Sequence, residues 1–210
     1  MNPNTCINRF YRHRQNFVHF DDTPKKDEWQ LEVYLHALGL MKKHHLRSVI
    51  DLGCGSGFKL VTYLSEYDTM GIEVPATCRW LKEHYPDHRW MEIEEAGTTK
   101  LAADVVICSD VIEHVINPDD ISNFLKSISF QYAVISTPAR DVAYRRWERP
   151  YWGPPRNPHH IREWTQKEFR NYMSQHFEIL DHRVTNLEQA TQMIVCRPLA
   201  PVDRRPSNES

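Results

Sequence analysis

Three glycines spaced two residues apart lie between two runs of different character. Gly53, Gly55 and Gly57 follow an apolar run at residues 49–52, and an amphipathic run begins at Phe58. A strand, a tight turn and a helix in this order bring the backbone close to a bound nucleotide. The spacing lacks the last interval of Gly-x-Gly-x-x-Gly, the fingerprint that places a pyrophosphate at a helix N-terminus. The turn therefore predicts a nucleotide site that differs from a dinucleotide site.

Three acidic residues are expected around this turn. Asp51 precedes the glycines, Glu73 ends the second predicted strand, and Asp110 follows the fourth. A carboxylate at Glu73 can accept two hydrogen bonds from the hydroxyls of a free ribose. Because so much negative charge suits a cation better than a pyrophosphate, the acids favour a positively charged ligand. An adenosyl sulfonium with its amino-acid tail fits this description.

Two histidines are candidate general bases for a hydroxyl acceptor. His114 follows the fourth predicted strand, and His160 lies in an aromatic-rich segment. A neutral imidazole is well suited to removing a proton near pH 7. The alternatives are structural: His114 can pack or bond to backbone in its turn, and His160 can hold its segment against Trp164. The 12 histidines form no cluster with metal-ligand spacing along the sequence, so no metal requirement is predicted.

Residues 138–164 are rich in arginine, proline and aromatic residues, have little periodicity, and are expected to form a long functional loop. Guanidinium groups suit phosphate or carboxylate, and aromatic faces suit a sugar or a stacked ring. The candidate substrate-binding residues are Arg140, Arg145, Tyr151 and Trp152. Two alternatives stay open: a solvated basic loop with buried aromatics, and a surface for a protein partner or a second subunit in a homodimer.

The elements that must position these residues alternate between helix and strand, which predicts a parallel sheet covered on both faces. Ligands of such sheets bind at the carboxyl ends of the strands, where all of the candidate motifs fall. A final pair of strands is expected to form an antiparallel hairpin. The predicted helices are residues 25–44, 58–67, 76–85, 117–129 and 165–176; the strands are 49–52, 69–74, 89–93, 103–109, 132–137, 177–184 and 191–197.

The start of each of three helices carries a specific signal. Thr23-Pro24 and Asn117-Pro118 each pair a capping side chain with proline in the first turn. Thr165 and Glu168 have the spacing of a capping box. Before the first helix, residues 1–22 are expected to form an ordered arm or a mobile lid.

Bulk composition narrows the class of protein. The 210 residues carry a formal net charge of −2 and five scattered cysteines without a CxxC pair. These values give no general attraction to nucleic acid, and they suit a reducing cytoplasm better than a disulfide framework. No apolar run is long enough to span a membrane. We expect one domain over residues 1–197, with an N-terminal arm and helix at 1–45, the loop at 138–164, and a disordered tail at 198–210.

Several motifs together resemble class I methyltransferases that use S-adenosyl-L-methionine, in particular the families called methyltransferase types 11 and 23. Val-Ile-Asp-Leu-Gly-Cys-Gly-Ser-Gly at residues 49–57 resembles their first motif, Gly-Ile-Glu at 71–73 their ribose-binding acid, and Ser-Asp-Val-Ile-Glu-His-Val-Ile-Asn-Pro at 109–118 their fourth-strand motif. The likeness covers roughly residues 25–197. Segments at 27–34, 135–141 and 153–165 look like a narrower bacterial subgroup associated with surface glycans or secondary metabolites.

The resemblance implies a Rossmann-like, doubly wound α/β fold of seven strands, mostly parallel, and roles for individual residues. The first motif, with Asp51, Gly53, Cys54 and Gly55, would face the methionine part of the cofactor, and Glu73 would hold the ribose. Glu94 would meet the adenine. Trp29 and Gln30 could close over the cofactor, although Trp29 could equally be a buried core contact. Lining the methyl-donor end would be Ser109, Asp110 and Val111.

The leading hypothesis is transfer of a methyl group from S-adenosyl-L-methionine to a hydroxyl of a small molecule, glycan or sugar nucleotide, leaving S-adenosyl-L-homocysteine. One alternative is an N- or carboxyl-methyltransferase on similar substrates, which needs no strong base. Nucleic acid is disfavoured as an acceptor, because the chain has no Asn-Pro-Pro-Tyr or Asp-Pro-Pro-Tyr motif after the fourth strand and no broad basic excess. Another alternative is a non-catalytic binding module that uses the arginine- and tryptophan-rich loop as a partner surface.

Overall fold

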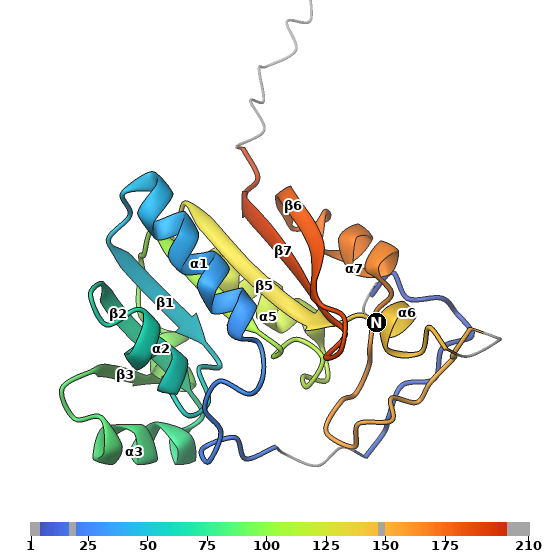
Figure 1. Ribbon diagram of the computed structural model, residues 1–210, viewed down its shortest axis with the longest axis horizontal. Coiled ribbons are helices and arrows are strands. Elements are labelled where there is room, and N and C mark those ends of the chain that lie inside the picture. The colour runs from blue at the N-terminus through green and yellow to red at the C-terminus, as the bar shows by residue number, and fades with distance from the viewer. Residues whose placement is uncertain (1–4, 17–19, 147–149, 201–210) are drawn as a thin grey trace, which may run out of the picture.

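The computed structural model describes residues 5–16, 20–146 and 150–200 of the chain. A single seven-stranded sheet, in the order β3-β2-β1-β4-β5-β7-β6, runs through this part (Figure 1). Strands β1 to β5 are parallel, whereas β7 pairs antiparallel with both β5 and β6. The predicted fold class, including the C-terminal antiparallel hairpin, is therefore confirmed. The strands are β1 Ser48–Leu52, β2 Asp68–Glu73, β3 Arg89–Glu92, β4 Val105–Ser109, β5 Tyr132–Pro138, β6 Phe177–Asn186 and β7 Thr191–Pro198.

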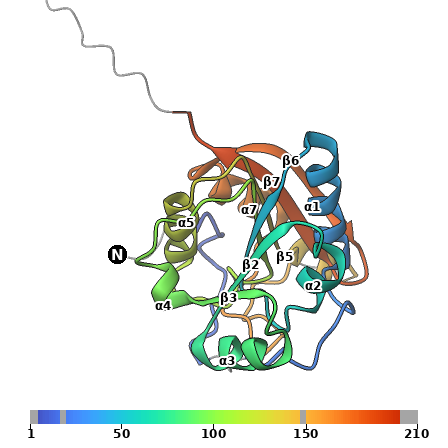
Figure 2. The ribbon, with the colours of Figure 1, turned by 90° about the vertical axis from the view of Figure 1, so that its left-hand side faces the viewer.

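Helices cover both faces of the sheet (Figure 2). One face packs against α1 Leu31–His44, α2 Phe58–Tyr63 and α3 Pro75–His84 through a core that includes Met41, Leu60 and Leu81. The other face packs against α4 Ile93–Ala96, α5 Pro118–Ser127 and α7 Gln166–Met173. Neighbouring residues of the central strands alternate between the two cores, as Val49 and Ile50 do in β1. This is why these strands are apolar on both faces.

The helix starts at Asn117 and Thr165 are those predicted. The Asn117 side chain accepts a hydrogen bond from the amide of Asp119, and Thr165 and Glu168 form a reciprocal capping box. The start predicted at Thr23 is wrong, because α1 begins at Leu31. The Thr23 amide and hydroxyl both donate to the carboxylate of Asp21 instead. Residues 20–30 therefore form an irregular strap between the start of the chain and α1.

The long loop at residues 138–164 was also predicted, and its described part contains one short helix, α6 Arg140–Ala143. Apart from Pro138, which ends β5, the other described residues of the loop form no helix or strand beyond an isolated bridge between Ala139 and Trp164. Residues 147–149 lie outside the described ranges, as do 201–210, most of the expected disordered tail.

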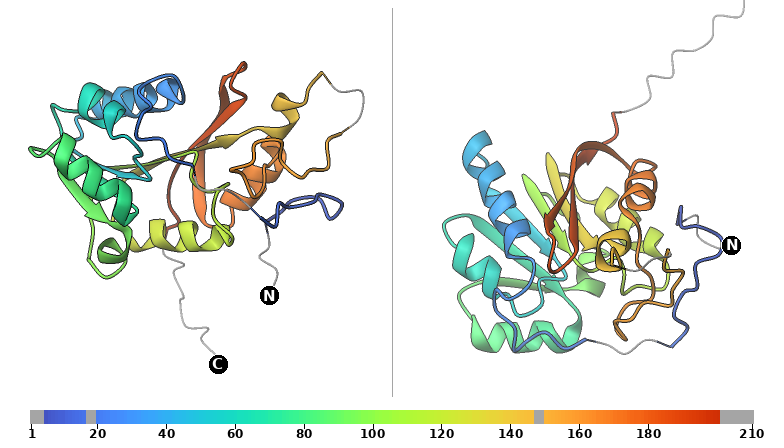
Figure 3. Two further views of the ribbon diagram at one scale, coloured as in Figure 1. Left: turned by 90° about the horizontal axis from the view of Figure 1, so that it is seen from below. Right: turned by 45° about the vertical axis from the view of Figure 1, so that its right-hand side comes forward.

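Residues 5–14 form an ordered arm that lies along this loop (Figure 3). The Trp164 indole donates to the carbonyl of Thr5, and the amides of Arg12 and Arg14 donate to the carbonyls of Trp152 and Ile161. Of the two expectations for the N-terminus, the described residues fit the ordered arm. None of the helices in the described ranges is long and apolar enough to cross a membrane.

Candidate functional site

A cavity of about 850 Å³ opens at the carboxyl ends of the parallel strands. This volume lies in the upper part of the range for small-molecule sites and is consistent with a cofactor together with a small acceptor. Its walls come from the turn after β1, the end of β2, the segment after β4, the loop at 138–164 and the strap at 20–30. Among the predicted site residues, those that line it are Trp29, Gln30, Gly53, Cys54, Glu73, Ser109, Asp110, Val111, His114 and His160.

The glycine turn needs its glycines for two separate reasons. Gly53 and Gly55 have positive φ values of 72° and 56°, a backbone conformation that other residues rarely adopt. A Cβ on Gly53 would also overlap the side chain of Val111, and one on Gly55 would overlap the carboxylate of Asp22. The strap is therefore in direct contact with the turn that was predicted to bind the nucleotide.

Asp51 and Glu73 are carboxyl groups next to this turn, the first fully buried and the second half-buried. Asp51 is fully buried: its Oδ2 accepts a hydrogen bond of 2.8 Å from the Tyr34 hydroxyl, and its Oδ1 has no partner. Glu73 accepts from the amides of Gly55 at 3.0 Å and Val74 at 2.7 Å. Burial raises the pKa of each carboxyl group to about 7. A bound cation would favour the charged form of both.

Asp110 joins the strap to the end of β4. It has a positive φ of 53°, a strained conformation of the kind found at functional sites. Its Oδ2 accepts from the Gln30 side chain at 3.0 Å, and its Oδ1 accepts from the Ser136 hydroxyl at 2.6 Å. Burial raises the pKa of this carboxyl group too. Gln30 is thus held over the cavity by a residue that is expected to line the methyl-donor end.

Two cofactor-site expectations need correction. Trp29 lines the cavity with half of its surface exposed, so the alternative that it is a buried core contact is wrong. Glu94 is exposed in the first turn of α4, and Ile93 lines the cavity in its place. An apolar side chain at that position suits the face of a flat base better than a carboxylate does.

The two candidate histidines come together although they are far apart in sequence. Their rings are 4.9 Å apart and nearly perpendicular. Nδ1 of His114 lies 2.7 Å from the carbonyl oxygen of His159, and Nδ1 of His160 lies 2.9 Å from Oε1 of Glu163. Beneath them is Glu113, fully buried, whose pKa is raised well above its usual range by burial and by the charge of Asp110.

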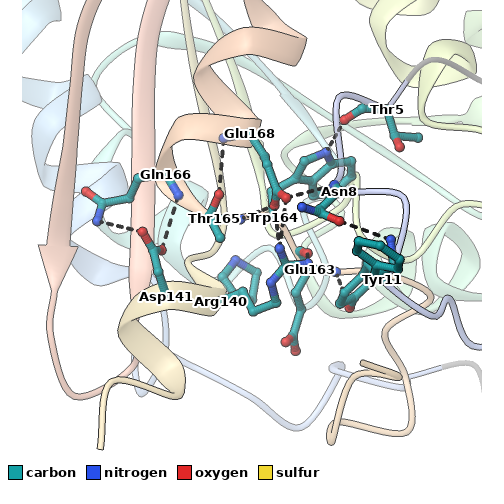
Figure 4. A network of polar contacts seen from close by, with 12 residues as sticks. Thr5, Asn8, Tyr11, Arg140, Asp141, Glu163, Trp164, Thr165, Gln166 and Glu168 are labelled. Atoms are coloured by element: carbon teal, nitrogen blue, oxygen red, sulfur yellow. Dashed lines mark hydrogen bonds and ion pairs between the residues drawn. The ribbon is translucent and has the colours of Figure 1, made fainter. Parts of the chain in front are cut away.

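The four residues predicted to bind substrate do not line the cavity. Arg140 is buried in a network that joins the arm, the loop and α7 (Figure 4). Its guanidinium makes two hydrogen bonds to Glu168, at 2.9 and 2.7 Å, donates to the Glu163 carbonyl, and lies 4.3 Å from the ring centre of Tyr11. All of these contacts are structural, and they fix the loop to the arm and to α7.

The other three have local partners as well. Arg145 donates to the carbonyls of Val142 and Leu187, and the Tyr151 hydroxyl donates to the carbonyl of Pro154. The ring of Trp152 packs edge-on against Phe10 of the arm, 6.4 Å between centroids. The alternative of a solvated basic loop with buried aromatics fits only in part, because Arg140 is buried and Trp152 is 37% exposed. Substrate binding by these residues stays a prediction.

Sequence reasoning missed several residues that the loop and the strap do bring to the cavity. Tyr144 and Arg156 lie together there, with the Arg156 amide donating to the Tyr144 hydroxyl at 3.2 Å. The sequence shows that the segment is rich in arginine and aromatic residues, but nothing in an aperiodic segment shows which arginine faces the cavity. Further lining residues are Phe20, Asp22, Lys25 and Lys26 of the strap, Pro138, Ala143, Asn157 and Glu163 of the loop, and Ile121 of α5.

Comparison with known proteins decides the family. A family profile described as a methyltransferase domain matches residues 11–180, well over half of the chain. The chain belongs to this methyltransferase family. It is an S-adenosyl-L-methionine-dependent methyltransferase with a class I fold, and S-adenosyl-L-methionine is its cofactor. A search of curated proteins found no match.

Solved structures share the fold at low sequence identity. Magnesium protoporphyrin IX methyltransferase from Synechocystis PCC 6803, with bound S-adenosylhomocysteine, has a TM-score of 0.59 at 13% identity, over 80% of this chain and 83% of that one. The Burkholderia thailandensis 1,6-didemethyltoxoflavin N1-methyltransferase has a TM-score of 0.56 at 16% identity, over 80% and 79%. The small RNA methyltransferase HEN1 has a TM-score of 0.58 at 19% identity, over 90% and 27%. Acceptors as different as these mean that the fold leaves the acceptor of this methyltransferase open.

Proposed function

We propose that this methyltransferase acts on a hydroxyl group of a small-molecule or glycan acceptor, with a sugar nucleotide as one candidate. The observation that carries the proposal is the pair His114 and His160, which lines the same cavity as the glycine turn and Asp110. Methyl transfer from a sulfonium needs alignment above all, but a hydroxyl acceptor must also lose its proton. The histidine pair gives this site a place to activate one.

Hydrogen bonds favour the form of each imidazole that can accept a proton. A carbonyl oxygen only accepts, so Nδ1 of His114 carries the hydrogen and the lone pair is on Nε2. The Glu163 carboxylate favours the same tautomer of His160, with the hydrogen on Nδ1 and the lone pair on Nε2. In the reaction the acceptor hydroxyl gives its proton to Nε2 of one of the two imidazoles. The oxygen of that hydroxyl bonds to the methyl carbon. The sulfur–methyl bond breaks, and its electron pair stays on sulfur in S-adenosyl-L-homocysteine.

The remaining walls of the cavity support a compact acceptor. Tyr144, Arg156 and Phe20 offer two aromatic faces and one guanidinium, which suit a sugar ring that carries a phosphate or carboxylate. The strap also lines the cavity, and the chain has a net charge of −2. Both features favour a small acceptor over a nucleic acid. The five cysteines form no disulfides, in keeping with the cytoplasmic location that we also propose.

The proposal is tested by incubating the protein and S-adenosyl-L-methionine with panels of hydroxylated small molecules, sugar nucleotides and short RNAs. Mass spectrometry should find a product heavier by one methylene among the first two panels. Methylation of RNA alone would overturn the acceptor class. Absence of cofactor binding in calorimetry would overturn the enzymatic role and favour a binding module.

Histidine variants separate hydroxyl acceptors from the alternative nitrogen or carboxylate acceptors. His114→Gln and His160→Gln together should lower kcat by about 10²-fold or more, the usual contribution of a general base. Full activity in the double variant would favour an acceptor that needs no base.

A further inference from the structure

The fold brings a carboxylate and two imidazoles to one point at the edge of the cavity. Glu113, His114 and His160 each present one ligand atom, and these three atoms lie within 4.8 Å of one another. Glu113 and His114 are adjacent after β4, whereas His160 comes from the loop that the arm and α7 hold in place. Their distance along the sequence is why ligand spacing gave no sign of the cluster.

The surroundings of both histidines are those of metal ligands. A ligating imidazole typically donates its other nitrogen–hydrogen bond to a carbonyl or a carboxylate, which fixes the tautomer and turns the lone pair towards the metal. Nδ1 of His114 faces the His159 carbonyl, and Nδ1 of His160 faces Glu163. Nε2 of His114 then points towards Oε1 of Glu113, 4.0 Å away.

Glu113 supplies a second and independent observation. Its side chain is fully buried, and its Oε2 accepts from the Thr137 hydroxyl at 3.0 Å. Its Oε1 is buried and has no hydrogen-bond partner. A buried carboxylate oxygen without a partner is costly, and a cation is the partner that offsets this cost best. The unpaired oxygen lies 4.0 Å from Nε2 of His114.

We propose that Glu113, His114 and His160 bind one divalent transition-metal ion at the edge of the acceptor cavity. Two imidazoles and one carboxylate suit Zn²⁺, Mn²⁺, Co²⁺ or Fe²⁺, whereas Mg²⁺ and Ca²⁺ prefer all-oxygen ligand sets. Three protein ligands leave coordination positions open, and the two histidines face the cavity, so the open positions face the acceptor.

Metal binding at this site requires the loss of one hydrogen bond. The Asn157 side-chain amide donates to Nε2 of His160 at 2.9 Å, and a metal ion must displace it from that lone pair. This competition points to an exchangeable ion rather than a permanently bound one. The earlier prediction that no metal is required rested on sequence spacing alone, and the experiment below tests it.

The role of the ion rests on the proposed function. A hydroxyl bound to a divalent cation has a lowered pKa, so it would lose its proton to water before its oxygen takes the methyl group. With the ion in place, the imidazoles hold the metal and do not accept the proton themselves. A chelator therefore distinguishes the two routes: it abolishes activity on the metal route and leaves it unchanged on the imidazole route.

Calorimetry on chelator-treated full-length protein tests the site without any acceptor. Titration with Mn²⁺, Zn²⁺ or Co²⁺ should show one ion per chain, bound at least about tenfold more tightly than Mg²⁺. Co²⁺ should also produce visible absorption bands that report its ligand field. Glu113→Gln and His160→Gln should each weaken binding by at least about tenfold, the lower end of what changes around metal sites cost. S-adenosyl-L-methionine binding by each variant shows that it is folded.

His84→Ala is the matched control, because it removes an exposed imidazole on α3 and should leave metal binding unchanged. Equal binding by the wild type and by Glu113→Gln would overturn the site, as would absence of any bound transition metal. These results leave the proposed function standing. Conversely, metal binding without methylation of any hydroxyl acceptor would overturn the proposed function and leave the metal site intact.

Discussion

Each oxygen of the Glu73 carboxylate accepts a hydrogen bond from a backbone amide, so the carboxylate is already oriented for the ribose that we propose it binds. The Gly55 and Val74 amides fix its position at the end of β2, in the wall of the cavity. Such preorganisation reduces the entropy lost when a ligand binds. At the scale of single residues, this makes Glu73 the most direct test of the cofactor site.

Glu73→Ala should weaken S-adenosyl-L-methionine binding by about 10-fold to 100-fold, because hydrogen bonds to a charged acceptor contribute about 1.5–3 kcal/mol each. Isothermal calorimetry measures the change. Glu94→Ala is the control: this exposed acid lies on α4, after β3, and does not line the cavity. A larger loss of S-adenosyl-L-methionine affinity in Glu94→Ala than in Glu73→Ala would mean that Glu94, and not Glu73, contacts the cofactor.

The affinity for S-adenosyl-L-methionine should depend on pH around neutrality. Burial raises the pKa of Glu73 to about 7 in the unliganded protein, and a cationic ligand with ribose hydroxyls prefers the deprotonated form. Affinity should therefore be constant above about pH 8 and fall by up to about tenfold per pH unit below pH 7. Calorimetry between pH 5.5 and 8.5 measures this, and Glu73→Gln should make the profile shallower, with the remaining slope due to Asp51, whose pKa is also raised to about 7. A profile that rises towards low pH would contradict the assignment.

At the scale of elements, caps and strands could be predicted from sequence, but the strap could not. Asn117 and Thr165 are followed directly by the helices that they cap, so local hydrogen bonding decides them. Thr23-Pro24 carries the same signal, yet residues 20–30 stay irregular and cover the cavity. Gln30 there bonds to Asp110 and Gln189, which are far away in the sequence. Tertiary contacts override local preference in that segment.

The buried ion pair between Arg140 and Glu168 should contribute strongly to stability. Glu168 also completes the capping box of α7 and accepts from the Asn8 amide of the arm. Glu168→Gln leaves a buried guanidinium without its charge partner, which costs about 3–5 kcal/mol of unfolding free energy. Urea denaturation followed by circular dichroism measures this.

Arg145→Ala should change the unfolding free energy by less than about 0.5 kcal/mol, because Arg145 lies at the surface. If Glu168→Gln instead abolished activity without loss of stability, Arg140 would return as a candidate for substrate binding.

At the scale of the whole molecule, the arm at residues 5–14 supports the acceptor side of the cavity. The Tyr11 hydroxyl accepts a hydrogen bond from the Glu163 amide, and Glu163 in turn contacts His160. The arm does not contribute to the lining of the cavity. Its effect on the reaction should therefore pass through the loop.

Deletion of residues 1–14 should lower the melting temperature and reduce kcat much more than it weakens cofactor binding. Tyr11→Phe is the milder variant: it removes one acceptor of a buried amide, at a cost of about 1–3 kcal/mol. Differential scanning fluorimetry and calorimetry compare the three proteins. A proportional loss of cofactor affinity would mean that the arm supports the whole cavity rather than the loop alone.

The sequence contains enough information for the cofactor side of the site and too little for the acceptor side. Glycine spacing and strand-end acids are local signals, and the turn, Glu73 and Asp110 all lie in the cavity wall. The loop has no periodicity, so the sequence does not show which of its residues face the cavity, and the four selected residues do not line it. The approach of His160 to Glu113 depends on contacts between the arm, the loop and α7, which no short motif encodes. The single-domain boundary at residue 197 stays a prediction.

The cysteines offer a way to observe the arm in solution. Four of the five are buried, and the half-buried Cys6 lies on the arm, where its sulfur accepts from the side chain of Gln175, just after α7. Thiol reagents modify accessible cysteines first. A fluorophore attached at Cys6 would therefore be a single label on the native protein, and its emission would report whether the arm stays docked during turnover.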